Sequence, residues 1–371
     1  MPKRSRTSAR RRGPTRRPPK AKAKAIAKNP FAALLSAVRR DVDGRLAHYL
    51  DDHVTRAKAH GAGVSEMAAA LRDLTLRGGK RARAALLVAG YRAASATASL
   101  EPALDAGVAL ELLHAYFLVH DDWMDHDDTR RGGPSVHTIL TRRLRSREKG
   151  EASAILAGDY AVALATEALS KVALEPERVR RVLACFAEMQ LDAVAGQQLD
   201  LLANAADIER VYELKTGSYT VRGPLRMGAL MAGAPPRLLE ALDGFALPVG
   251  VAFQLRDDLL SLFGDPKDTG KPFASDLRSG KKTVLVLTAL KKARGRDHRR
   301  LKQAIGNAKA TDAELEQAIA VIERSGARAH VEARIDDLVA QGLATLRRGR
   351  FRADALELLE GAARVLTLRR S

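Results

Sequence analysis

Apolar side chains recur every three or four residues over most of the chain from Phe31 onward. This spacing gathers them on one face of an α-helix, whereas a half-buried strand alternates with a period of two. No stretch shows a sustained period of two rich in β-branched residues. The pattern predicts helices at residues 31–58, 63–76, 81–95, 102–124, 151–173, 176–204, 207–232, 236–263, 282–293, 312–325, 327–346 and 352–368.

Glycine and proline cluster between these segments, for example at Gly78-Gly79, Gly132-Gly133-Pro134 and Pro235-Pro236. They mark the expected turns. Hydrophobic residues make up 46% of the chain and aromatic residues only 4%. Because alanine and leucine dominate the apolar set, helix is favoured over strand. The expected architecture is all-α, a single large helical bundle over residues 31–371.

The net charge of +19 is concentrated in one segment. Residues 1–28 hold twelve lysines or arginines and no acid, and residues 1–30 have almost no large apolar side chains. We therefore expect a disordered basic tail at residues 1–30. Such a tail could contact nucleic acid or an acidic membrane by counterion release. Since no aromatic residues interleave the charges, a solvated tail is the favoured interpretation.

The single cysteine, Cys185, excludes a disulfide within the chain, and we interpret it as a small core residue. No uninterrupted apolar stretch approaches the ~20 residues of a membrane span. The basic start is not followed by the apolar segment of a signal peptide. We expect a soluble, cytoplasmic protein without a transmembrane segment.

A first acidic cluster ends a strongly apolar helical run. Asp121 and Asp125 are four residues apart and share one helix face, and Asp122 flanks them. Three carboxylates this close repel one another, and a divalent cation would relieve the repulsion. Hard oxygen ligands with room for water and phosphate suit Mg²⁺. Arg130 and Arg131 follow and offer planar donors for phosphate oxygens.

A second acidic pair, Asp257 and Asp258, again ends an apolar helix. The glycine-rich segment after it carries Lys271, Lys281 and Lys282, compact cations that could reach a phosphate. Two acidic clusters on two helices predict one site, a metal clamp around a diphosphate.

Two further motifs are weaker. Gly78-Gly79 precede Lys80, Arg81 and Arg83 at a predicted helix start, where basic residues and backbone N–H groups favour an anion. Lys215 and Thr216 place a cation and a hydroxyl together inside another predicted helix.

The two acidic motifs stand in one order with GGKRAR (78–83), GQQLD (196–200), LKTGSY (214–219) and GKPFASDLRSGK (270–281). Over roughly residues 31–371 this order resembles the trans-isoprenyl diphosphate synthases, the polyprenyl synthetase family. The resemblance implies the class I isoprenoid synthase fold with a central cavity, in a homodimer. It implies condensation of isopentenyl diphosphate with dimethylallyl, geranyl or farnesyl diphosphate. It also implies Mg²⁺ as cofactor, three ions per site with substrate bound, with Mn²⁺ able to substitute.

The resemblance assigns residues position by position. The metal ligands would be Asp121, Asp122, Asp125, Asp257 and Asp258. Isopentenyl diphosphate would bind Lys80, Arg83, His114 and Arg131. The allylic diphosphate would bind Arg130, Lys215, Thr216, Gln254, Lys271 and Lys281. Thr216 and Gln254 would offer dipoles to the carbocation, and Gln197 and Asp200 would support the metal cluster. The catalytic set is Asp121, Asp125, Arg130, Lys215, Thr216, Gln254 and Asp257.

The chain departs from the family pattern at Ser261, where many relatives carry a third aspartate. Ser261 cannot supply a carboxylate, and Asp276 is expected to add support through water. Upstream of the first motif, Tyr116 and Phe117 are bulky, which in this family resembles the short-product pattern. We expect a C15 product first and a C20 product second.

Two alternatives stay open. A class I terpene cyclase shares the architecture and an aspartate-rich motif, but the basic site of Lys80, Arg83 and Arg131 has no purpose there. A regulatory subunit of another prenyl synthase is disfavoured by the intact first motif.

Overall fold

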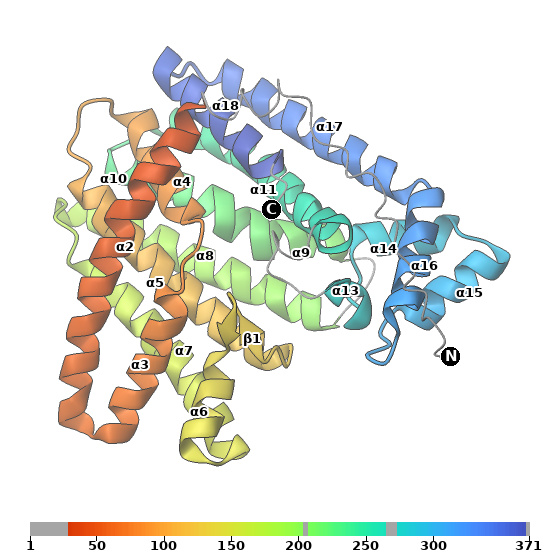
Figure 1. Cartoon of the computed structure of the whole chain (residues 1–371). Helices are drawn as coiled ribbons and strands as arrows, with labels where there is room; N and C mark the ends of the chain where they lie inside the picture. The colour runs from red at the N-terminus through yellow and green to blue at the C-terminus, as the bar shows by residue number, and fades with distance from the viewer. Residues whose placement is uncertain (1–28, 203–206, 265–272, 369–371) are drawn as a thin grey trace, which may run out of the picture.

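The computed structural model describes residues 29–202, 207–264 and 273–368, so almost all of the predicted tail at 1–30, and Lys271, lie outside the described residues. Within these ranges the chain is nearly all helical, with one pair of two-residue antiparallel strands (Figure 1). The predicted all-α class is confirmed.

The helices of the N-terminal half are α2 (Pro30–Ala57), a 3₁₀ turn η1 (Lys58–His60), α3 (Ala62–Leu76), α4 (Ala82–Ala94), α5 (Glu101–Met124), α6 (Val136–Leu144), α7 (Arg147–Ser170) and α8 (Pro176–Leu202). The remaining ones are α9 (Ile208–Val211), the π-helix η2 (Tyr212–Arg222), α10 (Gly223–Met231), α11 (Pro236–Phe263), α13 (Ser275–Arg278), α14 (Val284–Lys292), α15 (Gly295–Ala304), α16 (Asp312–Arg324), α17 (Ala327–Arg348) and α18 (Ala353–Thr367).

Among the described residues, the sequence pattern missed three α-helices and the strand pair. α6 has apolar residues at helical spacing but is only 9 residues long, α15 is rich in arginine and buries few apolar side chains, and α13 is a single turn. None of them fills a window long enough for an apolar period to stand out. The strands β1 (Thr129–Arg130) and β2 (Gly133–Pro134) form a hairpin where only a break was expected. The predicted helix at 207–232 was wrong as a regular α-helix, because its middle winds as η2.

Side-chain caps fix several helix starts. Asn29 accepts hydrogen bonds from the N–H groups of Phe31 and Ala32, and its own amide donates to the carbonyl of Gly361 at 3.0 Å. Asn29 thereby ties the start of α2 to α18. Thr311 and Glu314 form a reciprocal capping box at the start of α16. Each cap satisfies backbone N–H groups that have no partner within the helix.

The core has two parts. The larger part surrounds α5 and includes α2, α4, α7, α8 and α10. α4 and α10 cross at contact distance because Gly90 has no side chain; a Cβ there would lie 2.0 Å from the carbonyl oxygen of Leu225. The smaller part joins α13 to α17 with the end of α11. α11 therefore packs into both parts of the molecule, its first half into the larger part and its end into the smaller part.

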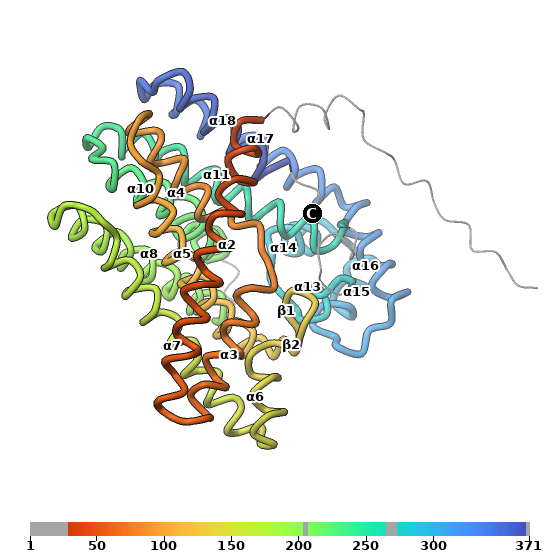
Figure 2. The backbone as a smooth tube through the Cα atoms, turned by 60° about the vertical axis from the view of Figure 1, so that its left-hand side comes forward, coloured from red at the N-terminus to blue at the C-terminus, as the bar shows by residue number. Residues whose placement is uncertain are grey.

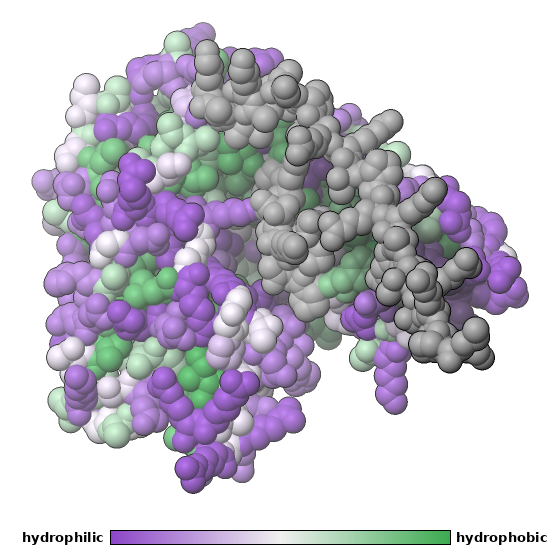
Figure 3. Space-filling view, viewed as in Figure 1, coloured by the Kyte–Doolittle hydropathy of each residue, from purple (hydrophilic) through white to green (hydrophobic). Residues whose placement is uncertain are grey.

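Three helices, α5, α7 and α11, are long and apolar enough to cross a membrane by length and composition alone. In this structure the apolar stretches of α5 and α11 are 67% and 50% buried among other helices. Their apolar character is thus used largely for packing inside the bundle. The visible face of the molecule is mostly hydrophilic, with apolar patches between helices (Figure 3).

Candidate active site

A polar cavity of about 190 Å³ lies where the ends of α5 and α11 meet η2 and the segment before α14. It brings together residues that are far apart in the sequence. Its walls are formed by Asp121, Asp200, Ile208, Val211, Tyr212, Lys215, Thr216, Gln254, Asp257, Asp258, Asp276, Lys281, Lys282 and Thr283. Both predicted acidic motifs contribute to this one cavity.

The π-helix η2 supplies the cavity with Lys215 and Thr216. A π-helix has a wider turn than an α-helix and often occurs at functional sites. The neighbouring helix α8 comes close because Gly196 has no side chain; a Cβ there would lie 2.4 Å from the backbone nitrogen of Lys215. The GQQLD motif therefore brings Asp200 within reach of Lys215.

Asp121 faces the cavity from the end of α5. Its Oδ1 lies 3.3 Å from the Nζ of Lys215, which also donates to Oδ2 of Asp200 at 2.7 Å. Burial acts to raise the pKa of Asp121, but Lys215, Lys281 and Arg130 lower it overall. Asp121 is therefore ionised at neutral pH.

Asp125 lies one turn later, at the C-terminal end of the same helix. Burial and the charge of Asp121 raise the pKa of Asp125. A group that resists ionisation beside another carboxylate is one that a cation would stabilise.

Asp122 turns into the protein instead. Its side chain is fully buried and accepts a hydrogen bond from Nε of Arg130 at 2.6 Å. Nη2 of Arg130 contacts the same carboxylate. Burial raises the pKa of Asp122 to about 6. Its Oδ2 has no hydrogen-bond partner among the described residues. Arg130 also reaches the half-exposed Asp127 at 3.1 Å.

In the second motif, as in the first, the second aspartate of the pair is held by other protein groups. Asp257 and Asp258 both border the cavity, but Asp258 is buried and accepts from the hydroxyl of Tyr212 and from Nε2 of Gln254 at 2.9 Å. Burial raises the pKa of Asp258 to about 6. The hydroxyl of Ser261 donates back to the carbonyl of Asp258 at 2.9 Å, within its own helix.

Lys281 stands opposite these carboxylates. Burial acts to lower its pKa, but Asp276, Asp200, Asp121 and Asp125 raise it overall. Lys281 therefore stays charged inside the protein. Asp276, which the sequence suggested as a supporting acid, is buried and borders the same cavity.

A second basic region lies beside the middle of α5. Arg83 stacks over the ring of Tyr219 at 4.3 Å, and the hydroxyl of Tyr219 lies 2.8 Å from Nδ1 of His114. Burial and Arg81 lower the pKa of Arg131 to about 10. Burial and Arg83 hold the pKa of His114 well below its usual range. Basic groups whose charged forms are disfavoured by burial and by one another form a site that an anion would stabilise.

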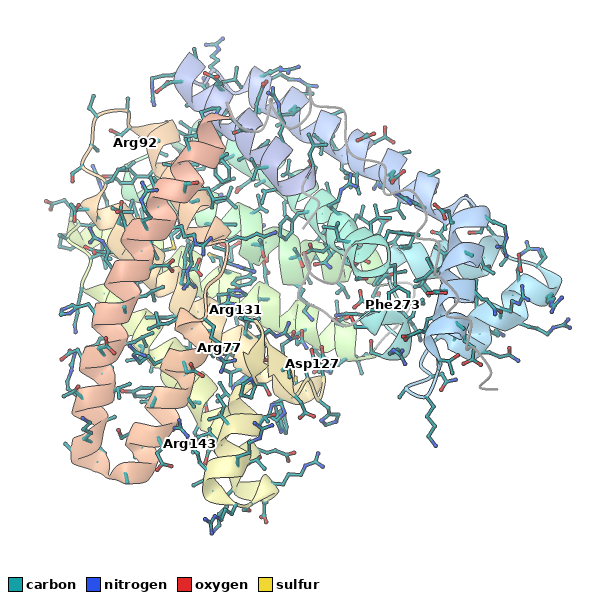
Figure 4. All side chains as sticks on the ribbon, viewed as in Figure 1. Arg77, Arg92, Asp127, Arg131, Arg143 and Phe273 are labelled. Atoms are coloured by element: carbon teal, nitrogen blue, oxygen red, sulfur yellow. The ribbon has the colours of Figure 1, made fainter. Side chains whose placement is uncertain are left out.

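The hairpin presents Arg131 to this region. Arg77, which follows directly after α3, donates to the carbonyls of Arg130 and Pro134 at 3.1 Å and 2.6 Å, which fixes the hairpin against the end of α3. Arg77 and Arg131 lie close together beside it (Figure 4). Lys80 is exposed on the adjoining segment.

Arg81 differs from the prediction. It precedes α4 with a left-handed φ of 50° and is buried, so it is not part of a basic helix start. Its guanidinium donates to Asp43 at 2.7 Å, to Glu111 at 2.9 Å and to the carbonyl of Thr75 at 2.9 Å. Arg81 thus joins α2, α3 and α5 and holds the segment that carries Lys80.

The donor set fits magnesium. Among the described residues no three His, Cys, Asp or Glu side chains lie close enough to enclose an ion by themselves. Asp121 and Asp257 reach one cavity from opposite helices, with Asp125 one turn beyond Asp121. Mg²⁺ is typically held by one or two carboxylates, water and substrate phosphates, and this arrangement provides that.

Comparison with known proteins decides the family. Residues 64–322 match the family described as Polyprenyl synthetase. The chain belongs to the polyprenyl synthetase family. This membership confirms the resemblance found in the motifs, the class I isoprenoid synthase fold and the enzyme class, a transferase of prenyl groups.

Relatives share most of their length with this synthetase. A short chain isoprenyl diphosphate synthase of Methanocaldococcus jannaschii is 36% identical over 69% of this chain and 76% of its own. A (2E,6E)-farnesyl diphosphate synthase of Mycobacterium tuberculosis is 34% identical over 81% of each chain. The solved geranylgeranyl pyrophosphate synthase of Corynebacterium glutamicum, complexed with isoprenyl diphosphate and magnesium, has a TM-score of 0.85 and 34% identity over 91% of this chain and 99% of that one.

Sequence reasoning missed Tyr212 and the N–H of Val284, which meet beside Asp258. The sequence did carry one signal for Tyr212. It precedes Lys215 by three residues, a spacing that places both side chains on the same face of a helix. The predicted product-length residues do not border the cavity: the ring of Phe117 packs on Tyr219 at 4.8 Å and that of Tyr116 on His120 at 4.7 Å. Gln197 does not border it either.

Proposed function

We propose that this synthetase condenses isopentenyl diphosphate with an allylic diphosphate into a trans short-chain prenyl diphosphate. The observation that carries the proposal is the cavity between the acidic ends of α5 and α11. Asp121 and Asp257 border it from opposite helices, and Lys215 and Lys281 share its wall. Carboxylates for metal ions beside lysines for phosphate oxygens suit the binding of a diphosphate.

Asp121, Asp125 and Asp257 would hold the metal ions, which we assign as Mg²⁺, three per site with substrate bound, replaceable by Mn²⁺. Bound magnesium would supply Lewis-acid stabilisation of negative charge on the departing diphosphate. Asp122 and Asp258 remain candidate ligands by resemblance, but a direct role would require them to leave Arg130 and Tyr212. The magnesium in the Corynebacterium glutamicum complex supports the choice of ion.

The allylic diphosphate would lie against Lys215, Lys281 and Arg130, with Lys271 a further predicted contact. These cations neutralise the diphosphate as its bond to the allylic carbon breaks. Thr216 and Gln254 border the same space and present neutral dipoles to the positive charge that develops on that carbon.

Isopentenyl diphosphate would bind the second basic region through Lys80, Arg83, Arg131 and His114. The lowered pKa keeps His114 neutral, so it acts as a hydrogen-bonding group. The double bond of isopentenyl diphosphate attacks the allylic carbon and forms the new carbon–carbon bond. A proton is then lost to the departing diphosphate, which completes the product.

The proposal extends to the length of the prenyl product. Tyr116 and Phe117 pack against the core and neighbouring rings, and they lie one turn upstream of Asp121, where an elongating chain would extend. We propose a C15 product over a C20 product. Replacing both residues with alanine is expected to lengthen the product, with Tyr116→Phe as the control that keeps the bulk. Unchanged products on chromatography would place the floor of the cavity elsewhere.

We also propose a homodimer in the cytoplasm. α8 lies on the outside of the bundle (Figure 2), and its Leu191, Val194 and Leu202 are 72%, 50% and 66% exposed. A contiguous apolar helix face is typical of a protein interface. Leu191→Glu with Leu202→Glu is expected to give monomers by light scattering, whereas an unchanged mass would exclude this face.

The test of the function is incubation of the full chain with isopentenyl diphosphate and each allylic primer, with Mg²⁺ or with EDTA. We expect prenyl diphosphates by mass spectrometry with Mg²⁺ and none with EDTA. A cyclic hydrocarbon would support a terpene cyclase, and the absence of product with every primer would contradict the proposal.

A further inference from the structure

Four side chains of η2 and α11 form a continuous hydrogen-bonded chain along the cavity wall. The hydroxyl of Tyr212 donates to Oδ2 of Asp258, and Nε2 of Gln254 donates to Oδ1 of Asp258 at 2.9 Å. The hydroxyl of Thr216 completes the chain by donating to Oε1 of Gln254 at 2.7 Å. The chain therefore runs along the cavity wall from Tyr212 through Asp258 and Gln254 to Thr216.

The direction of this chain is fixed at its inner end. The backbone N–H of Val284 donates to the hydroxyl oxygen of Tyr212 at 3.1 Å. An N–H group cannot accept a hydrogen bond, so the proton of the Tyr212 hydroxyl is left to point at Asp258. An ionised carboxylate only accepts, so it takes a hydrogen bond from Tyr212 and another from Gln254.

The same logic orients the outer end. With the amide nitrogen of Gln254 turned toward Asp258, its oxygen faces Thr216 and can only accept. The hydroxyl proton of Thr216 is then committed to Gln254, and its lone pairs lie away from that bond. Thr216 therefore presents the negative end of its dipole, not its proton, to the cavity.

Burial restrains the chain from reversing. Tyr212, Asp258 and Thr216 are 5%, 4% and 8% exposed and Gln254 is partly buried between them, so few water molecules can compete for these hydrogen bonds. In a surrounding of low polarity, linked hydrogen bonds polarise one another. Tyr212, Asp258 and Gln254 together behave as one oriented unit.

We propose that Tyr212 and Asp258 are positioning residues, which act through Gln254 to turn the Thr216 dipole toward the positive charge formed in the reaction. This inference rests on the proposed prenyl transfer. It gives Asp258 a role other than that of a metal ligand. It also gives a function to Tyr212, which the motif resemblance did not include.

Tyr212→Phe is the first test, because it removes one hydroxyl and keeps the ring. We expect kcat to fall about tenfold, the size found when a partner that orients a catalytic group is lost. The KM of both substrates and the Mg²⁺ concentration for half-maximal rate should stay within about twofold, since no ligand contact changes. Tyr49→Phe is the matched control: it removes a hydroxyl that donates to Glu167 at 2.6 Å, away from the cavity, and should leave kcat unchanged.

Asp258→Asn is the second test, because it keeps the shape and permits the reversed chain. The new amide can donate to Gln254, which then turns and donates to Thr216, so the Thr216 proton faces the cavity. We expect a fall in kcat of about a hundredfold with the same Mg²⁺ dependence as the wild type. Thr216→Ser keeps the hydroxyl and should retain most of the activity. Thermal melts confirm that each variant is folded.

Wild-type kcat in Tyr212→Phe would overturn the inference. A raised Mg²⁺ requirement in Asp258→Asn would also overturn it, because Asp258 would then be a metal ligand. Failure of the proposed function is distinguishable from both outcomes, since the wild-type chain itself would then form no prenyl product.

Discussion

The acidic ends of α5 and α11 differ in what holds the second aspartate of each pair. At α5 Asp122 is paired with a guanidinium, that of Arg130, whereas at α11 Asp258 is held by a neutral hydroxyl and a neutral amide. Both carboxyls have a pKa raised to about 6 by burial. The difference teaches that a buried aspartate can be held by a charge or by an oriented dipole chain, with different consequences when it is replaced.

The ends differ again one turn later. α5 continues to a third carboxylate, Asp125, whereas α11 continues to Ser261, whose hydroxyl returns to its own helix. The α5 side of the clamp therefore carries more negative charge. On the α11 side, Asp276 and Lys281 border the cavity from the segment beyond the helix.

The largest expected effect comes from the aspartates that the two ends share. Asp121→Asn and Asp257→Asn are each expected to lower kcat/KM by about a hundredfold or more. Metal stabilisation of a transition state is worth several kcal/mol, and each hundredfold corresponds to about 2.7 kcal/mol. Steady-state assays with mass-resolved products measure this. A loss at only one of the two helices would show that the clamp is one-sided.

Replacement of Asp122, which is held by the charge of Arg130, should lower the unfolding free energy more than replacement of the other aspartates. Asp122→Asn leaves Arg130 buried with only the half-exposed Asp127 as counterion, and we expect a loss of about 3 kcal/mol in unfolding free energy. The matched control, Asp127→Asn, should cost less than about 1 kcal/mol because exposed ion pairs contribute little. Urea unfolding at pH 7.5 compares the two. Equal losses would contradict the distinction.

Asp258, which is held by neutral dipoles, should make the unfolding free energy depend on pH. The folded-state pKa of Asp258, about 6, lies above the ordinary value of 3.8, so the folded state binds its proton more tightly. The contribution of Asp258 to stability is therefore present below about pH 4 and is lost as the pH rises through 6. Without Mg²⁺ or substrate, Asp258→Asn should gain stability relative to the wild type over this range, by at most about 3 kcal/mol. A difference that does not change with pH would contradict the assignment.

The smallest expected effect concerns the missing third acid. Ser261→Asp would make the α11 end resemble the α5 end, and we expect the Mg²⁺ requirement to fall by about twofold with little change in kcat. Ser261→Asn has nearly the same size as Ser261→Asp without the charge and should behave like the wild type. A large gain in kcat from Ser261→Asp would show that the natural chain lacks an essential ligand.

Much of the fold could be predicted from the sequence because long amphipathic helices carry a clear period. The predicted ends of the helix at 236–263 match α11, and the helix at 312–325 differs from α16 by one residue. A helix as short as α6, or one as polar as α15, does not give a period long enough to be recognised. The π-helix η2 could not be predicted, because its wide turns depend on packing against α8 and α11.

The acidic motifs and basic residues of the site could also be identified, since carboxylates and cations in this fixed order are typical of a metal-assisted diphosphate site. The sequence could not show which aspartate of each pair is held by other protein groups. The hydrogen bond that Asp258 accepts from Tyr212 depends on contacts between η2 and α11 that no local pattern records. The sequence likewise groups Arg81 with Lys80 and Arg83, although Asp43 and Glu111 draw it into the core.

The most direct test of the clamp is a magnesium titration of the steady-state rate for four variants, each with one aspartate changed to asparagine: Asp121, Asp122, Asp257 and Asp258. The Mg²⁺ concentration for half-maximal rate should rise at least about tenfold for Asp121 and Asp257, which face the cavity. It should stay near the wild-type value for Asp122 and Asp258, which are held by Arg130 and by Tyr212 with Gln254. Four equal shifts, or shifts confined to the buried pair, would contradict the account.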